Sequence, residues 1–568
     1  MITIIVLLIL AGVSIATLTG ENGILTRAND AKENTEEATA REKVEVEVLG
    51  SYGKNGKLDL DRLKENIQNS GGTVIGDSFP VTVTMDGYDF SVDAEGNVIL
   101  IGKNNGDLVA GGEWNGKVNT PKLAEGMIPI KWDDSQTKWV ICSEHDPEWY
   151  NYIDQSNGLD GTSKWANVML SDGKYYAQNC SNVNTQEKEV AKIGQVIDET
   201  ELGSMFVWIP RYAYEIDSLY HTSSSNTGGI IKIAFLEGTK TYNSGDTVEY
   251  SYQGDRGTAT LTNASGQGNW NEHPAFNYGG TIIPGIWVAK FEASSTTDTN
   301  YGGEDVTNLN VKILPGKQSW RQIGVGNCYT NCVKMNNSEN ASYYGISQDD
   351  NKIDPHLMKN SEWGVVAYLT QSSYGRNQHE VTPNAYGYDN NKYIYTGYAG
   401  DGTSSGNEET LASKPTNVYY YDTDKGMLAS TTGNETGIYD LSGGAWERVA
   451  AYINNNHEYL RTEGQSLLDA PSKHKDVYEV NGADTGMNNF NNMSEITGEA
   501  IWEVSYSYEQ NDRTSWYGDV RYCPSGSTPF FPRGGAYWSY ELSGVFSVST
   551  TWGGEDGSAS FRPTIVVY

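Results

Sequence analysis

The stretch of sequence that decides the fold lies near the end of the chain and reads "PRGGAYWSYELSGVFSVSTTWGGEDGSASFRP", from Pro532 to Pro563. It carries Arg533 near one end and Arg562 near the other, and Arg533 precedes two glycines, which allow tight turns. The middle is rich in tyrosine, tryptophan and serine and has no cysteine, histidine or lysine. The two ends therefore predict attachment to a scaffold, and the middle predicts a surface that binds something.

A first set of residues is expected to hold that scaffold together. Tryptophans can fill a core that is poor in leucine, provided that their indole N–H groups find partners. Glutamate and arginine under irregular loops can form charge-assisted pairs, and the arginine fork holds backbone better than lysine would. The predicted structural residues are Trp363, Trp446, Glu447, Arg533, Gly534, Gly535 and Arg562.

A second set is expected to contact a ligand. Tyrosine and tryptophan give large contact areas at low entropic cost, and serine adapts its hydrogen bonds to the partner. The alternative is that some of these aromatic side chains are merely buried. The predicted ligand-binding residues are Trp516, Tyr517, Tyr537, Trp538, Tyr540, Glu541, Ser547, Ser549, Trp552, Glu555 and Asp556.

Composition limits the classes of partner. The 568 residues carry a net charge of −33, which repels phosphate backbones and excludes nucleic acid as a partner. An acidic rim should likewise disfavour anionic ligands. The 63 glycines, 38 tyrosines and 15 tryptophans describe a loop-rich protein that depends on aromatic anchors. The 5 cysteines are too few and too scattered for a disulfide scaffold, and we expect Cys328 and Cys332 to share one helix face.

Known templates for catalysis and metal binding give no match. The sequence has no HExxH motif and no complete Walker loop, and its 7 histidines form no cluster at ligand spacing. We therefore expect no catalytic residue, no metal ligand and no cofactor. A structural calcium ion stays open, because "DTDKG" at 422–426 is similar to a fragment of a calcium loop without its closing glutamate.

The first residues, "MITIIVLLILAGVSIATL", contain no charge, and the first ionisable side chain is Glu21. A helix of 18 to 20 such residues spans roughly 30 Å, about the thickness of a bilayer core. We therefore expect a transmembrane helix over residues 1–20 that places the acidic remainder outside the cell. A signal peptide and a buried soluble helix are the alternatives.

Patterning divides the rest of the chain. Apolar residues at three- and four-residue steps among charges predict a helical stalk over 21–70, and alternation after it predicts a small β module over 71–102. Glycine- and asparagine-rich sequence predicts a linker over 103–122. Residues 123–568 are expected to form one large domain.

Two families are similar to parts of this sequence. The start of the chain resembles type IV pilins and pilin-like proteins, although their basic leader is absent. The large domain resembles the formylglycine-generating enzyme (sulfatase-modifying factor) family, which has an elaborated C-type-lectin-like fold. That resemblance is carried by "FVWIPRY" at 206–212, "SEWGVVAYL" at 361–369, "GIYDLSGGAWERVA" at 437–450, "RGGAY" at 533–537 and "SFRPTIVVY" at the end.

The resemblances imply a fold class and a function. The expected fold is α+β: a transmembrane and stalk helix with a small pilin-like β module, then a large, loop-rich C-type-lectin-like domain. The two cysteines that bind copper in the oxidising enzymes are absent between Gly535 and Phe561, so the family's catalytic site is not expected here. The same segment is also similar to the variable proteins of diversity-generating retroelements, which vary it to change their ligand.

The sequence therefore predicts a non-enzymatic binding or adhesion protein at the cell surface, anchored by a single span or associated with a pilus. Its expected partners are a protein or glycan ligand on another cell or surface, the membrane, and other pilin subunits. The alternatives are an enzyme of the same fold with an unrecognised site and a structural filament subunit.

Overall fold

The structure is a computed structural model, and it divides the chain into two compact units. Unit 1 comprises Met1–Leu108 with His145–Pro147, and unit 2 comprises Val109–Glu144 with Glu148–Tyr568. The residues that the structure describes are 38–54, 56–76, 78–86, 88–103, 118–156, 161–178, 180, 182–262, 264–297, 303–384, 393–395, 418–479, 497–506, 513–524 and 526–568.

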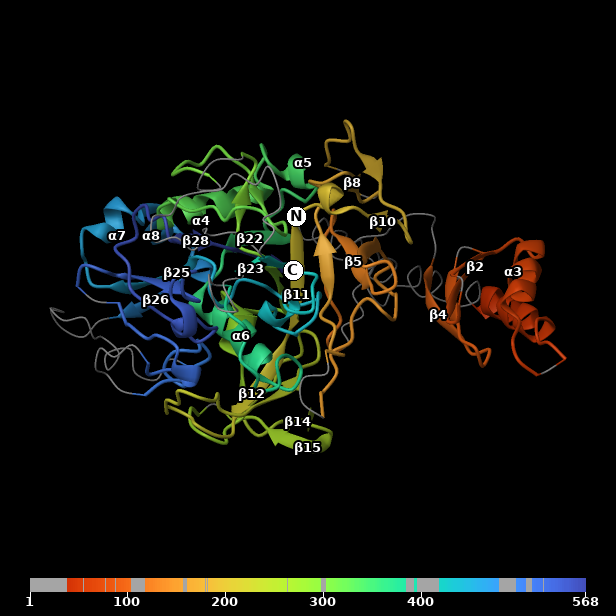
Figure 1. Cartoon of the computed structure of the whole chain (residues 1–568), viewed down its shortest axis with the longest axis horizontal. Coiled ribbons are helices and arrows are strands. Elements are labelled where there is room, and N and C mark those ends of the chain that lie inside the picture. The colour runs from red at the N-terminus through yellow and green to blue at the C-terminus, as the bar shows by residue number, and fades with distance from the viewer. Residues whose placement is uncertain are drawn as a thin grey trace, which may run out of the picture. The chain divides into compact units, whose positions relative to one another are not determined.

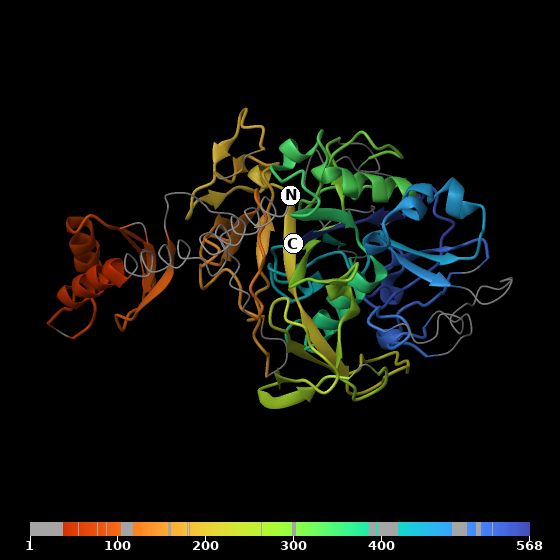
Figure 2. The ribbon, with the colours of Figure 1, turned by 180° about the vertical axis from the view of Figure 1, so that it is seen from behind.

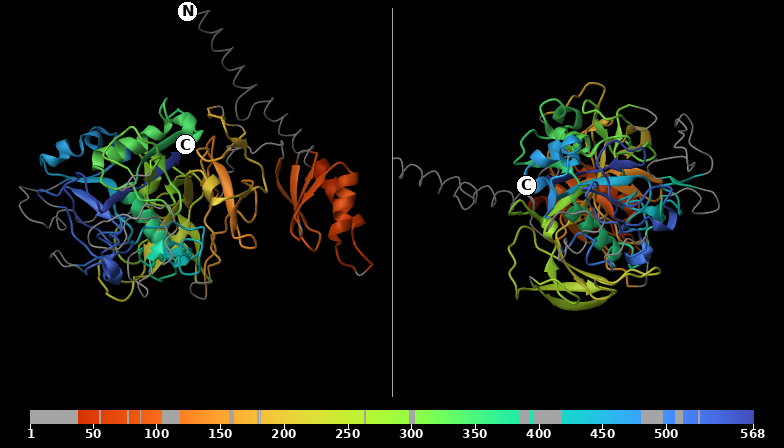
Figure 3. Two further views of the ribbon diagram at one scale, coloured as in Figure 1. Left: turned by 45° about the horizontal axis from the view of Figure 1, so that its top comes forward. Right: turned by 90° about the vertical axis from the view of Figure 1, so that its left-hand side faces the viewer.

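Unit 1 consists of helices packed on one face of a four-stranded antiparallel sheet, whose strands are neighbours in chain order (Figure 3). Strand β2 alternates buried and half-buried residues, as expected for a sheet with one covered face. Val83 and Phe90 of the sheet share one core with Val44 and Leu63 of the helices. The elements are a helix over residues 38–50, α3 (Leu60–Asn69), β1 (Thr73–Ile75), β2 (Val81–Met85), β3 (Tyr88–Val92) and β4 (Val98–Lys103).

Unit 2 is built on an eight-stranded sheet, in which the last strand of the chain lies between two strands from its middle (Figure 1). Its inner strands are continuous buried runs, because both faces are covered. In spatial order the strands are β10 (Val196–Ile197), β6 (Lys138–Ile141), β5 (Ile128–Asp133), β7 (Asn167–Met169), β11 (Met205–Pro210), β19 (Gly285–Ala289), β29 (Pro563–Val567) and β22 (Ile353–Leu357).

Two smaller sheets accompany it. One has the order β13 (Ile231–Phe235), β12 (Tyr212–Ile216), β16 (Asn271–Glu272). The other contains β26 (Asp476–Glu479), β25 (Trp446–Asn454), β27 (Phe530–Arg533) and β28 (Ala559–Phe561). The hairpin of β14 (Thr247–Tyr252) and β15 (Asp255–Thr260) lies at one end of unit 2 in both opposite views (Figures 1 and 2). Further strand pairs are β8 (Tyr175–Tyr176) with β9 (Glu189–Val190), β17 (Asn277–Tyr278) with β18 (Thr281–Ile282), β20 (Ser294–Ser295) with β21 (Val311–Lys312), and β23 (Tyr393–Tyr395) with β24 (Val418–Tyr420).

The helices of unit 2 are short, and the longest, α6 (Asn360–Gln371), is buried along its whole length. Glu362 in its first turn accepts a hydrogen bond from the backbone N–H of Lys359 at 2.9 Å, which satisfies a donor at the helix start. The other α-helices are α4 (Val325–Val333), α5 (Ala341–Tyr344), α7 (Tyr459–Thr462) and α8 (Gln465–Asp469). The 3-10 helices are η1 (Glu199–Glu201), η2 (Pro274–Phe276), η3 (Lys334–Asn336), η4 (Met427–Ala429), η5 (Ser472–His474), η6 (Trp516–Gly518) and η7 (Tyr540–Leu542).

The predicted fold class is wrong as stated. The part of the chain that the structure describes is a mixed α/β protein made mostly of strands, and the expected stalk helix breaks after residue 50. The chain turns at Gly53, whose N–H donates to the Lys57 carbonyl at 2.8 Å, and α3 then folds back onto the sheet. From residue 38 onward, the amphipathic pattern belongs to helices that cover a sheet.

The prediction of a single-pass membrane anchor is also corrected. Among the residues described, no helix is long and apolar enough to cross a membrane. The predicted span at residues 1–20 lies outside the described residues. The membrane-anchored localisation and the membrane partner that depended on it are therefore not supported.

The buried ion pair of Arg562 with Glu447 yields a stability prediction. Arg562→Ala should lower the free energy of unfolding of unit 2 by about 3–5 kcal/mol, because Glu447 would stay buried without its cation. The exposed pair of Lys138 with Asp198 is the matched control, and Lys138→Ala should cost less than about 1 kcal/mol. Urea unfolding followed by tryptophan fluorescence measures both, and equal losses would contradict the prediction.

Candidate functional site

Both ends of the predicted binding stretch are attached to the same strand, β25. Strand β27 pairs with β25 in antiparallel fashion, with Glu447 opposite Arg533. Strand β28 pairs with β25 in parallel, with Trp446 opposite Ala559. The residues between them, 534–558, are called the C-terminal segment below, and they begin and end on neighbouring positions of one sheet.

Arg533 fixes the start of this segment. Its guanidinium group is fully buried and donates to the carbonyl oxygens of Ser547 at 2.9 Å, Glu499 at 2.9 Å and Ala500 at 3.0 Å. It also lies over the ring of Trp363, 5.3 Å from the centroid. Burial lowers the pKa of Arg533 to about 10, so the group stays charged at neutral pH. The Arg533 guanidinium thus holds the backbone of several segments together by hydrogen bonds.

Arg562 fixes the other end. Its Nε donates to Glu447 Oε2 at 2.6 Å, and its Nη2 donates to the second carboxylate oxygen. The same guanidinium donates to the carbonyl oxygens of Ala289 at 2.8 Å and Tyr439 at 2.9 Å. Trp446, expected in the core, is only half-buried. The bidentate pair raises the pKa of Arg562, although burial opposes it.

The turn after Arg533 requires glycine. Gly534 and Gly535 have φ values of 85° and 88°, in the left-handed region that disfavours side chains. A Cβ atom at Gly535 would lie 2.4 Å from the Oγ of Ser543. Trp363 packs beneath this turn and donates its indole N–H to the Val545 carbonyl at 2.7 Å. The turn and the tryptophan together hold the segment against the core.

The structure separates the predicted binding residues into three groups. Trp538, Tyr540 and Trp552 expose 51%, 46% and 40% of their side-chain surface. Glu541 and Glu555 are also exposed, whereas Tyr537, Ser549 and Asp556 are half-buried. These eight residues are available to a ligand. The buried ones are Trp516, Tyr517 and Ser547.

The expected ligand contact is corrected for Trp516 and Ser547, and Tyr517 is largely covered. Trp516 is fully buried and donates its indole N–H to the Leu219 carbonyl at 3.0 Å. Ser547 is fully buried, and its hydroxyl donates to the Leu542 carbonyl at 2.8 Å. Tyr517 is only 9% exposed and stacks on Phe546. These side chains support the segment from within.

The exposed residues lie in different surroundings. Trp552 packs against Tyr459 of α7, with 5.5 Å between the ring centroids. Glu541, in η7, lies 3.6 Å from the guanidinium of Arg513. Tyr540 begins the same 3-10 helix. We use the name C-terminal face for the surface formed by Tyr537, Trp538, Tyr540 and Glu541.

A small cavity lies beside this face, between the end of α6 and the C-terminal segment. Its volume is about 10 Å³, and its lining consists of Thr370, Gln371, His379, Glu380, Val381, Tyr517, Asp519 and Val545. Asp519 is fully buried, and its Oδ2 accepts from the Phe546 N–H at 3.0 Å. Its Oδ1 has no hydrogen-bond partner in the part of the chain that the structure describes. Sequence reasoning found no signal for Glu380 or Asp519, because each lies in an ordinary polar stretch of the chain.

Both carboxyl groups of the cavity are electrostatically perturbed. Burial raises the pKa of Glu380 to about 7, with a further contribution from Glu541 and an opposing one from Arg376. Burial raises the pKa of Asp519 well above its usual range, and Glu380 raises it further. Glu541 of the C-terminal face thus raises the pKa of Glu380, and Glu380 raises the pKa of Asp519.

Backbone strain is found at the same place. Tyr517 has a φ of 62° and Tyr540 a φ of 48°, which is rare for bulky residues with a Cβ. Asn377 and Gln378, which precede the cavity residue His379, also have positive φ values. Such strain persists where the surrounding structure over-determines it, and it gathers at ligand sites. The strained residues thus mark this region as a functional candidate.

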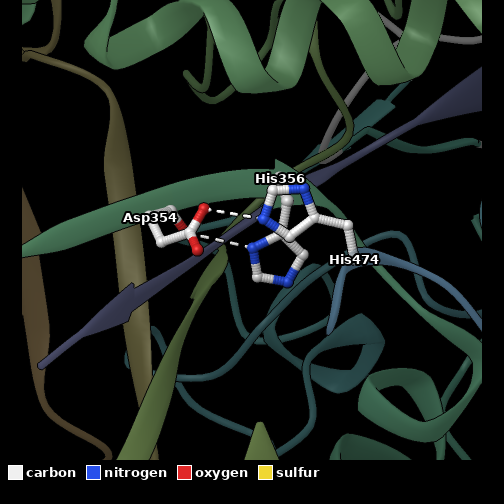
Figure 4. Close-up of side chains that lie close together, drawn as sticks. All are labelled: Asp354, His356 and His474. Carbon is white, nitrogen blue, oxygen red and sulfur yellow. Dashed lines mark hydrogen bonds and ion pairs between the residues drawn. The ribbon is translucent and has the colours of Figure 1, made fainter. Parts of the chain in front are cut away.

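A second candidate is the cluster of Asp354, His356 and His474, which lies on β22 and η5 (Figure 4). The potential ligand atoms all lie within 4.8 Å of one another. His474 Nε2 is 2.9 Å from Asp354 Oδ1, and His356 Nδ1 is 3.0 Å from the Asp354 carbonyl. The two imidazole rings are stacked, with centroids 5.2 Å apart.

The donors of this cluster fit an ion-pair network better than a metal. The Lys473 ammonium lies 2.5 Å from Asp354 Oδ2, where a cation would bind. The other ring nitrogens face Glu362 Oε1 at 2.8 Å and the Tyr329 hydroxyl at 2.8 Å. A divalent ion would have to displace the Lys473 ammonium. Sequence reasoning missed the cluster because His356 and His474 lie far apart in the chain.

Only one of the two stacked rings is favoured as a cation. Burial disfavours charge on His356, but the carboxylate of Glu362 outweighs it and raises the pKa of that histidine. Burial lowers the pKa of His474, and the charge on His356 lowers it further. The network therefore favours a proton on His356 over one on His474.

No family model matches the chain, and no curated protein matches it. Neither the pilin resemblance nor the enzyme resemblance is supported by a relative, and function has to be inferred from geometry. None of the 5 cysteines, all of which lie among the described residues, forms a disulfide bond, and four of them are buried. Burial raises the pKa of Cys328 to about 12, which disfavours a reactive thiolate on α4.

The pH dependence of stability tests the network. Burial alone would raise the pKa of Glu362, but His356 and Lys359 lower it to about 2 from an ordinary value of 4.5. Its stabilising contribution is therefore complete above pH 4.5 and is lost as the pH falls towards 2. Glu362→Gln should lower the free energy of unfolding near neutral pH and weaken its decline in acid.

Urea unfolding at a series of pH values measures this effect. Glu339→Gln is the control, because Glu339 is an exposed carboxylate of the same unit and should leave the profile unchanged. A parallel acid decline in the wild-type protein and Glu362→Gln would show that the network does not stabilise the fold in this way.

Proposed function

We propose that unit 2 binds a ligand, a protein or a glycan, through its C-terminal face without chemical conversion. The observation that carries this proposal is the exposure of Trp538 and Tyr540 on a segment whose ends are fixed by buried arginines. A rigid support reduces the entropy that a binding surface loses when its ligand arrives. Exposed aromatic residues next to polar groups are the usual anchors of such surfaces.

The position of the aromatic residues supports binding over packing. Trp538 exposes half of its surface, although burial of a tryptophan side chain is strongly favourable. Its neighbours Ala536 and Ser539 are buried, so the chain presents the side chain outward from a fixed backbone. An exposed large apolar side chain on ordered backbone is a common mark of an interaction site.

Catalysis by an unrecognised site is the alternative that the sequence left open, and it predicts turnover of a substrate. The buried cysteines do not favour it, because raised pKa values keep Cys328 and Cys332 protonated. A filament subunit without a ligand is the other alternative. Both alternatives, the enzyme and the filament subunit, predict that substitutions on the C-terminal face leave binding unchanged.

Substitution of the two aromatic residues tests the proposal. The full-length protein, fluorescently labelled, is applied to printed arrays of glycans and of peptides. Trp538→Ala combined with Tyr540→Ala should abolish the spots that the wild-type protein binds, a loss of at least tenfold in signal for two anchors of about 1–2 kcal/mol each. The melting temperature should change by no more than a few degrees.

The matched control is Ile193→Ala with Val196→Ala, which removes two exposed apolar side chains near β10, the strand at one edge of the main sheet. This control should bind as the wild-type protein does. If the aromatic double variant keeps the wild-type signal, or if no array element retains the wild-type protein, the proposal is wrong.

A further inference from the structure

We propose that the cavity beside the C-terminal face receives a primary ammonium group, as at the end of a lysine side chain. The inference rests on the proposed function and specifies its ligand chemistry. Asp519 and Glu380 would accept the hydrogen bonds of the ammonium group. Tyr517, Val381 and Val545 would contact the methylene groups behind it.

The first argument is an excess of hydrogen-bond acceptors. The Thr370 hydroxyl donates to the Val366 carbonyl at 2.7 Å, so its oxygen can only accept from a ligand. The Tyr517 hydroxyl donates towards Gln378 at 2.8 Å and Gln371 at 3.1 Å. These donors are thus committed elsewhere, and once Glu380 and Asp519 are ionised a ligand in the cavity has to donate.

Two further lining residues agree with this. The Gln371 side-chain amide donates to the Gly229 carbonyl at 2.8 Å. His379 Nδ1 lies 3.1 Å from the carbonyl oxygens of Arg376 and Asn377, which requires a proton on that nitrogen. In the tautomer that these contacts select, Nε2 is an acceptor. An ammonium group, with three N–H donors and no acceptor, matches this lining.

The second argument is the buried carboxyl oxygen of Asp519. A buried acceptor without a partner costs roughly 1–3 kcal/mol of stability, so native structures rarely keep one without a reason. Asp519 Oδ1 is such an acceptor and lines the cavity. The approach of the segment to this side chain is close, because a Cβ at Gly544 would lie 2.0 Å from Asp519 Oδ2. A cationic donor would satisfy the free oxygen.

Size and shape limit the ligand group. A volume of about 10 Å³ is at the lower limit for one group of the size of water or ammonium, and a guanidinium or a trimethylammonium head is larger than that. The walls formed by Val381, Val545 and the Tyr517 ring are apolar and suit an alkyl stem. A lysine side chain combines such a stem with such a head.

The charges around the cavity have to be considered together. Glu380, Asp519 and Glu541 are acidic, and His379 and Tyr517 are the other titratable groups of the lining. Arg376 lies behind Glu380 and donates to its carbonyl oxygen at 2.9 Å, and Arg533 influences Asp519 from the core. Among the described residues, no lysine or arginine forms an ion pair with either cavity carboxyl.

This arrangement couples binding to proton release. Burial raises the pKa of both carboxyls, that of Glu380 to about 7, so Glu380 is partly protonated near neutral pH in the free protein. A bound cation favours the ionised form and lowers both pKa values. Affinity should therefore rise as the pH increases through about 7, and binding should release protons to the buffer.

Calorimetric titration of the full-length protein tests the proposal, with Nα-acetyl-L-lysine amide as the probe. The Nε-acetylated and Nε-trimethylated forms of the probe should bind at least about tenfold more weakly, because one lacks the charge and the other lacks the donors. Asp519→Asn and Glu380→Gln should each weaken binding about tenfold or more. Glu339→Gln, which alters an exposed carboxylate outside the C-terminal segment, should stay within about twofold.

Glu380→Gln should also remove the rise in affinity near neutral pH. Titrations in buffers of different ionisation enthalpy measure the protons released, and the wild-type protein should release more than Glu380→Gln. Thermal unfolding separates a misfolded Asp519→Asn variant from a folded one, and Glu380→Gln provides a second, half-buried position if the first fails to fold.

The outcomes distinguish this inference from the proposed function. Equal binding of the lysine probe and its Nε-acetylated form would overturn the ammonium site, as would an absence of binding by either. If the aromatic double variant loses array binding but the wild-type protein does not bind the lysine probe, the C-terminal face binds a ligand of other chemistry. If the probe binds as expected and arrays show no effect of the double variant, the cavity acts without the aromatic face.

Discussion

The fold of unit 2 depends on a buried cation that has no carboxylate partner among the described residues. The guanidinium of Arg533 is surrounded by carbonyl oxygens of Ser547, Glu499 and Ala500 and by the face of Trp363. Carbonyl dipoles replace the water that the charge loses, which is necessary because an unsolvated buried charge is very costly. Segments that are remote in sequence are thereby drawn to one point.

The second buried arginine, Arg562, has a carboxylate partner. The two ends of the C-terminal segment are therefore held by different kinds of interaction. Arg562 is neutralised by Glu447 and joins β29 to β25. It holds the end of the chain in the main sheet, whereas Arg533 holds the start of the segment against α6 through Trp363. Both charges are buried, whereas Trp538 and Tyr540 between them are exposed.

The sequence predicted the part of this arrangement that depends on residue type. Paired arginines, glycine pairs and tryptophans in apolar runs indicate buried anchors, because few other positions require them. It could not predict which aromatic residues face outward: Trp516 and Trp538 have similar neighbours, yet only the second is exposed. Exposure depends on the path of the backbone in three dimensions. Similarly, Glu380 and Asp519 meet only through tertiary packing.

The attachment of both ends of residues 534–558 to β25 makes this segment a closed loop within the folded domain. The entropy of closing a loop changes only slowly with its length, by about 0.6 kcal/mol for each doubling. Substitutions or changes of length at Trp538–Glu541 should therefore change the free energy of unfolding of the sheet only slightly. The residues that hold the fold together are thus distinct from the exposed residues of the C-terminal face, which can change without loss of the scaffold.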